Sequence, residues 1–118
     1  MQKTLGRNEF PLERDIQAQI LKWLRNRPAS FTVKLAAGPY SMPGLPDILH
    51  IEAGKAYFFE VKRPGGKVTP LQSSVMDKLI RAGADTGVVT SRDDVQQILE
   101  PLFCPHGRDW DECSDCCH

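Results

Sequence analysis

Hydrophobic and polar residues repeat along the chain with two periods, and the helical period marks three segments. The first runs from near residues 8–11 to about Asn26, where the following Arg27-Pro28 ends it. The second has Thr69 at the N-cap and Pro70 at the first helical position, and it stops at Gly83. The third is capped by Ser91. The apolar positions that define these helices are Leu12, Ile16, Ile20, Trp23 and Leu24, then Leu71, Val75, Leu79 and Ala82, then Val95, Ile98, Leu99 and Leu102.

The two-residue period predicts four strands, at residues 31–35, 47–52, 56–62 and 86–90. A short connection containing Gly54 joins the second and third strands, which indicates a hairpin. The strand–helix–strand order that follows implies a parallel pair with a right-handed crossover. The predicted fold is therefore α/β, a mixed β-sheet flanked by helices in the order α-β-β-β-α-β-α.

Length and composition fit one globular domain. The chain has 118 residues, 41% hydrophobic and 25% charged, and it shows no internal repeat. No apolar run is long enough to span a bilayer, and the first residues lack the core of a signal peptide, so we expect an intracellular, cytoplasmic protein that does not bind membranes. We predict a main domain over residues 1–103 and a separate Cys/His-rich tail over residues 104–118.

Charged residues at the ends of two predicted strands form the candidate site. Asp47 opens the second strand, while Glu60 and Lys62 close the third, two residues apart and therefore on one face. If the strands pair as a hairpin, the three groups converge at one end of the sheet. Two carboxylates suit a hard divalent cation, and an adjacent ammonium suits a reacting phosphate. The alternative is that these are ordinary exposed charges.

Two further residues allow two readings each. Glu13 falls inside the apolar arc of the first helix, where an acid is costly unless it is paired or bound to metal. It also suits a frayed first turn, where the helix dipole favours it. Gln72 completes a capping box with Thr69, and this role accounts for a glutamine at position 72 without any part in catalysis.

The net charge is zero, but its distribution is uneven. Residues 1–67 carry 11 Lys and Arg against 6 Asp and Glu, whereas residues 68–118 carry 4 against 9. The candidate site lies in the basic half, which is compatible with a nucleic-acid partner and equally with an uneven surface that has none. Candidate nucleic-acid contacts are Lys34, Tyr40 in the glycine- and proline-containing loop 36–44, and Arg63 and Lys67 in the basic loop after the third strand.

The tail holds all four cysteines. Cys113 and Cys116 have the spacing of metal ligands, and Cys104 or His106 would supply the rest of a structural Zn²⁺ site. Chance clustering in a reduced, flexible tail is the favoured interpretation, because terminal segments are commonly disordered.

The motif Pro46-Asp47 followed by Glu60-Val61-Lys62 resembles the PD-(D/E)xK nuclease motif. With Gln72, and with Glu13 on the leading helix, the chain resembles the VRR-NUC branch of that superfamily over residues 9–100, in its compact, stand-alone, phage-type form. The resemblance implies a restriction-endonuclease-like fold that cuts nucleic-acid backbones with Mg²⁺ or Mn²⁺. Single-domain members resemble Holliday-junction resolvases, which implies a homodimer acting inside a bacterial or phage-infected cell.

The resemblance also implies residue roles. Asp47 and Glu60 would be metal ligands, with the Val61 carbonyl completing part of the shell. Lys62 would orient or activate the attacking water. Glu13 would be a further ligand or a water-mediated partner, and Gln72 matches a glutamine of the family pattern at the start of the helix.

From these residues and this resemblance we expect a metal-dependent endodeoxyribonuclease. Its expected substrate is branched or flapped DNA such as a four-way junction. Two alternatives remain: a catalytically inactive DNA-binding module that has kept the fold, and an interaction protein that works through a zinc-binding tail.

Overall fold

The structure is a computed structural model that describes residues 12–35 and 41–100. Its elements follow the predicted order, so the prediction of an α/β fold with a mixed sheet is confirmed. The elements are α1 (Glu13–Arg25), β1 (Ser30–Lys34), β2 (Ile48–Glu52), β3 (Lys55–Val61), α2 (Pro70–Arg81), β4 (Asp85–Val89) and α3 (Arg92–Leu99).

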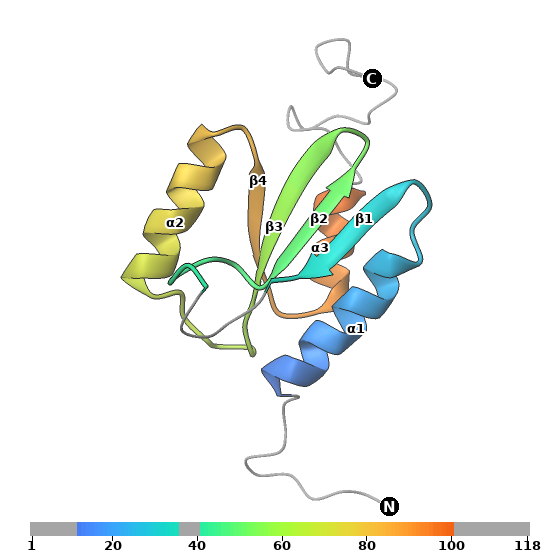
Figure 1. Ribbon diagram of the computed structural model, residues 1–118. Coiled ribbons are helices and arrows are strands. Elements are labelled where there is room, and N and C mark those ends of the chain that lie inside the picture. The colour runs from blue at the N-terminus through green and yellow to red at the C-terminus, as the bar shows by residue number, and fades with distance from the viewer. Residues whose placement is uncertain (1–11, 36–40, 101–118) are drawn as a thin grey trace, which may run out of the picture.

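The four strands form one sheet in the order β1-β2-β3-β4 (Figure 1). β1 pairs with β2 and β2 with β3 in antiparallel fashion, whereas β3 and β4 are parallel, as the crossover through α2 requires. The predicted strand ends differ from the observed ones by at most one residue. Asp47 therefore lies just before β2 and Lys62 just after β3, both at the same end of the sheet.

The hairpin between β2 and β3 turns in two residues. Ala53 and Gly54 both have positive φ, at 54° and 76°, and Glu52 pairs directly with Lys55. Positive φ at both central residues is the geometry of a type I′ turn, whose twist matches that of the flanking strands. This tight turn fixes the register, and the register in turn decides which side chains meet at the far end of the hairpin.

The main core lies between one face of the sheet and the helices α1 and α3. Its buried residues are Ile16, Ile20, Leu21, Leu24, Ile48, Phe59, Val61, Val89 and Val95. Two predictions for α1 were inaccurate: Leu12 is 41% exposed, and Leu21, which the predicted stripe left out, is buried. α1 contacts β1, β3 and α3 together, so its apolar face is wider than one stripe.

α2 lies on the opposite side of the sheet, beside β4 (Figure 1). Its predicted capping box is confirmed: Thr69 and Gln72 exchange hydrogen bonds across the first turn. The segment before β2 packs against this helix at Gly44, which has a φ of +83°. A Cβ atom there would lie 2.9 Å from Cγ of Leu71. Only glycine fits this conformation and this spacing, so the chain reaches buried Pro46 and then Asp47 along a fixed path.

A chain of polar contacts, buried at His50 and partly exposed beyond it, joins the other end of the sheet to the C-terminal ends of α1 and α3. His50 is fully buried, and its ring nitrogens lie 2.7 Å from Thr32 Oγ1 and 2.8 Å from Glu52 Oε1. Arg27 binds both Glu52 oxygens, at 2.6 and 2.8 Å, and reaches Glu100 at 2.6 Å. These contacts satisfy polar groups that are costly to bury alone, so they stabilise the fold away from the candidate site.

Within the described residues, no helix combines the length and apolar character that a membrane crossing needs.

Candidate metal and active site

The strand register brings Asp47 and Glu60 together. The last registered pair of β2 and β3 is Ile48 with Phe59, and the Asp47 N–H donates to the Phe59 carbonyl at 3.1 Å, which extends the pairing. Asp47 and Glu60 are therefore opposite each other and on the same face. Because Ile48 and Phe59 point into the main core, this pair points to the side of the sheet that α2 occupies.

Asp47 is held by main-chain groups of neighbouring strands. Its Oδ2 accepts a hydrogen bond from the Val61 N–H at 2.9 Å, and its own carbonyl accepts from the Leu35 N–H at 2.8 Å. One carboxylate oxygen is thus fixed by β3. A ligand placed so rigidly needs little ordering when a cation arrives.

Glu60 is buried, with 3% of its surface exposed. Its Oε2 accepts a hydrogen bond from Gln72 Nε2 at 3.0 Å and lies 3.6 Å from Lys62 Nζ. Its Oε1 is also buried, and residues 12–35 and 41–100 provide no hydrogen-bond partner for it. A buried acceptor without a partner is rare and costly, and it calls for an explanation.

The site strongly disfavours the charged form of Glu60. The pKa of this carboxyl group is raised to about 7, chiefly by burial and next by the neighbouring charge of Asp47. Lys62 opposes the rise through its charge and its hydrogen bond, while Glu13 adds a smaller increase. A shift of this size, caused by burial together with a specific carboxylate partner, is typical of a functional site.

Gln72 makes the capping-box contact with Thr69 and a second contact with Glu60. Its Oε1 accepts from the Thr69 N–H at 3.0 Å, which is the capping-box contact. Its Nε2 donates to Glu60 from the same amide. Because an amide has separate donor and acceptor ends, one side chain caps α2 and orients the Glu60 carboxylate.

Glu13 is the first residue of α1 and is exposed, so it is not the costly buried acid that the apolar arc implied. Its charge nevertheless reaches Glu60, because it contributes to the raised pKa of that group. Among the described residues, no three His, Cys, Asp or Glu side chains are grouped to hold a metal.

Three of the four candidate nucleic-acid contacts fall within the described residues. Lys34 is exposed at the end of β1, where it pairs with Ile48, so it lies at the candidate-site end of the sheet. Arg63 and Lys67 lie in the loop directly after Lys62. Tyr40 and the tail residues Cys104, His106, Cys113 and Cys116 lie outside the described residues. A Zn²⁺ site in the tail stays a prediction, which metal analysis of the purified protein tests.

The residues present fit a hard divalent cation. The unpartnered Glu60 oxygen and the Asp47 carboxylate are oxygen donors on one face, and Mg²⁺ is commonly held by one or two protein carboxylates, with water and substrate phosphate completing its shell. A bound cation would also offset the repulsion between the two carboxylates, which contributes to the raised pKa of Glu60.

The sequence interpretation missed the Val61 N–H, which holds Asp47, because it considered only the carbonyl of that residue. Continuing the hairpin register one residue beyond β2 would have revealed this contact. The bond from Gln72 to Glu60 was also missed. It depends on where the start of α2 lies against β3, and no local pattern reports that position.

Comparisons with known proteins identify the family to which this fold belongs. The sequence profile of the VRR-NUC domain matches residues 13–93. One solved structure, described as a VRR_NUC domain, superposes with a TM-score of 0.64 at 26% identity and covers 77% of this chain and 97% of its own. A second, described as a VRR_NUC domain protein, has a TM-score of 0.61 at 16% identity, covering 77% and 87%. No curated protein matches the chain.

Fold and site together define a nuclease domain of the restriction-endonuclease-like superfamily, for which DNA is the implied substrate. Within that class, the chain belongs to the VRR-NUC domain family.

Proposed function

We propose that this protein is a divalent-metal-dependent endonuclease that hydrolyses phosphodiester bonds in DNA. The observation that carries the proposal is the unpartnered Glu60 oxygen, buried beside Asp47 and Lys62 at one end of the sheet. Within a nuclease domain, a buried carboxylate with a raised pKa and an open coordination position has a direct use as a cation ligand.

Each residue of the site has a separate task. Asp47 and Glu60 would hold Mg²⁺ or Mn²⁺, with the Val61 carbonyl as a further ligand. When bound, the cation supplies Lewis-acid stabilisation of the charge that develops on the phosphate oxygens. The Lys62 ammonium, 3.6 Å from Glu60 Oε2, would orient the attacking water and offset charge on the phosphate. Gln72 keeps Glu60 in place.

The proposed substrate is branched DNA, such as a flap or a four-way junction, cut by a homodimer. Lys34, Arg63 and Lys67 lie near the site and are suited to phosphate contacts, which position a duplex without reading its sequence. One small site cuts one strand, so symmetric cutting of a junction needs two copies related by a twofold axis.

Cleavage of a substrate panel tests the proposal. Single-stranded, duplex, flapped and four-way-junction DNA would each be incubated with the full chain in Mg²⁺, in Mn²⁺ and in EDTA. We expect cleavage with either metal, none in EDTA, and the fastest rate on the branched substrates. DNA binding without cleavage in either metal would show a catalytically inactive module instead. Sedimentation with and without junction DNA tests the dimer separately.

A further inference from the structure

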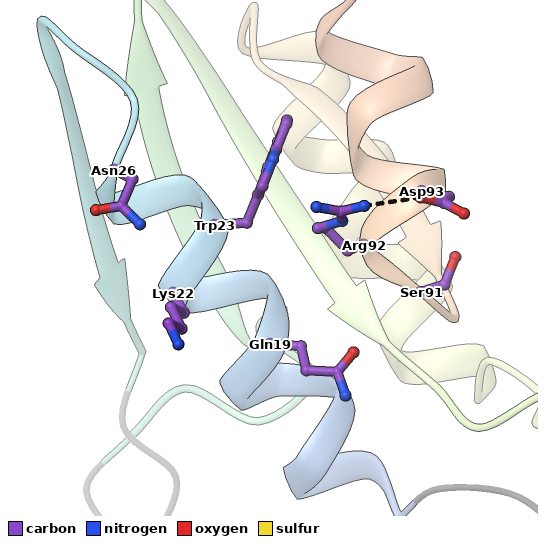
Figure 2. Close-up of a pocket in the computed structure, with 7 residues that line it drawn as sticks. All are labelled: Gln19, Lys22, Trp23, Asn26, Ser91, Arg92 and Asp93. Atoms are coloured by element: carbon purple, nitrogen blue, oxygen red, sulfur yellow. Dashed lines mark ion pairs between the residues drawn. The ribbon is translucent and has the colours of Figure 1, made fainter.

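A groove with a volume of about 490 Å³ lies between α1 and the start of α3. In Figure 2 the Trp23 side chain extends from α1 into the space between the two helices, and the Arg92 guanidinium points toward it from α3. The groove residues combine an aromatic ring, two cations, two amides, one hydroxyl and one carboxylate. They are Gln19, Lys22, Trp23, Asn26, Ser91, Arg92 and Asp93.

The Trp23 ring is a fixed surface. The Arg27 guanidinium lies 4.9 Å from its centroid, within the range of a cation–π contact. Arg27 is itself held by Glu52, at 2.6 and 2.8 Å, and by Glu100 at 2.6 Å. Because Arg27 is held in this way, it restrains the Trp23 ring that it contacts. The Trp23 ring therefore loses little conformational freedom when a flat ligand stacks on it.

The two cations of the groove are only loosely held. The Arg92 guanidinium lies 6.0 Å from the Trp23 centroid, at the outer limit of a cation–π contact. Its ion pair with Asp93 is 3.5 Å long, and the two side chains are 48% and 81% exposed, so this pair contributes little stability. Lys22 is exposed on α1. Both cations are therefore available to an anionic ligand.

The start of α3, which forms one wall of the groove, lies at the same end of the sheet as the candidate active site. The Lys62 N–H donates to the Val89 carbonyl at 2.9 Å, and Ser91 follows Val89 by two residues. The groove lies between α1 and α3, whereas Glu60 and Gln72 meet on the α2 side, so the groove and the candidate active site lie on opposite faces of the sheet.

We infer that this groove binds an unpaired nucleotide of the DNA substrate, with its base stacked on Trp23 and its phosphate paired with Lys22 and Arg92. Aromatic rings beside cations are how proteins hold single-stranded DNA regardless of sequence. The amides of Gln19 and Asn26 offer donors and acceptors to the base edge. The inference rests on DNA being the substrate, and among the branched substrates it favours flapped DNA, whose flap carries unpaired bases.

Tryptophan fluorescence in EDTA tests the inference without cleavage. The chain has two tryptophans, Trp23 and Trp110, so a Trp110→Phe protein reports on Trp23 alone. We expect a short oligothymidylate to quench this fluorescence, and a blunt duplex of equal length to quench it much less. No quenching by the oligothymidylate, or equal quenching by both DNAs, would overturn the inference.

Arg92→Ala and its matched control Arg81→Ala complete the test. Arg81 is an exposed arginine in the last turn of α2, so its replacement makes the same change of charge outside the groove. We expect Arg92→Ala to weaken oligothymidylate binding about tenfold and Arg81→Ala to leave it nearly unchanged. Trp23→Leu should weaken binding by a similar factor, provided that circular dichroism shows this variant to be folded. Equal losses for both arginine variants would contradict the inference.

The same assays separate this inference from the nuclease proposal. Quenching by the oligothymidylate together with no cleavage of any substrate in Mg²⁺ or Mn²⁺ would support the groove and overturn the nuclease. Cleavage without quenching would support the nuclease and overturn the groove.

Discussion

Gln72 Nε2 donates a hydrogen bond to Glu60 Oε2 at 3.0 Å, while Oε1 of the same amide accepts from the Thr69 N–H at 3.0 Å. One side chain therefore connects the first turn of α2 to the carboxylate at the end of β3. A residue that looks like an ordinary helix cap also orients a candidate metal ligand. Formation of the helix and geometry of the site are coupled through this amide.

Gln72→Glu separates these two roles. A glutamate at this position still accepts from Thr69 in a capping box, but it cannot donate to Glu60 and it adds a like charge beside it. We expect the melting temperature to change little, and Mn²⁺ affinity and cleavage rate to fall about tenfold or more, as for other groups that orient metal ligands. Wild-type cleavage in this variant would limit Gln72 to capping.

Lys62→Met tests the proposed role of the ammonium. Methionine keeps most of the length and apolar volume of lysine but removes the charge 3.6 Å from Glu60 Oε2. We expect single-turnover cleavage to fall by at least about a hundredfold, with DNA binding in EDTA largely unchanged. Lys78→Met, at an exposed position in the last turn of α2, is the matched control and should cleave normally. Full activity of Lys62→Met would remove this residue from the site.

Glu13→Gln and Asp15→Asn distinguish a role at the site from a helix-dipole effect. Both acids are exposed in the first turn of α1, so their interaction with the helix dipole is similar. Of these two acids, Glu13 is the one that contributes to the raised pKa of Glu60. We expect Glu13→Gln to lower the cleavage rate in Mg²⁺ and Asp15→Asn to preserve it. Equal behaviour of the two variants would reduce Glu13 to a first-turn charge.

Glu52 should make folding stability depend on pH. The hydrogen bonds from Arg27 lower the pKa of Glu52 from 4.5 to about 2, against the opposing effect of burial. A lowered folded-state pKa contributes stability that is present above the unfolded value and lost as the pH falls from about 4.5 to about 2. Urea unfolding should show Glu52→Gln to be roughly 1–3 kcal/mol less stable than wild type at pH 7. This difference should shrink toward pH 2; a difference independent of pH would contradict the assignment.

Much of the site follows from local sequence rules. Alternation along the strand places Glu60 and Lys62 on one face, and the hairpin brings Asp47 opposite Glu60, because a two-residue turn fixes the register. The cap at Thr69 and the crossover that makes β3 and β4 parallel are equally local. These features depend on residues that are near each other in the chain, so their geometry can be worked out before the fold is known.

The remaining features depend on contacts between distant segments. Arg27 meets partners that are 25 and 73 residues away, and the groove at Trp23 exists only because α3 packs beside α1. In the sequence, Trp23 fits the apolar stripe of the first helix and Arg92 is an ordinary charged residue after a cap. Their proximity is a consequence of tertiary packing, which periodicity does not report.

The central claim is that Asp47 and Glu60 hold a divalent cation. The most direct measurement is anomalous diffraction from crystals of the protein soaked in Mn²⁺. The account predicts a peak that contacts a carboxylate oxygen of each residue, and its loss in the Glu60→Gln variant. A well-ordered site without such a peak, or with Mn²⁺ bound only elsewhere on the protein, would contradict it.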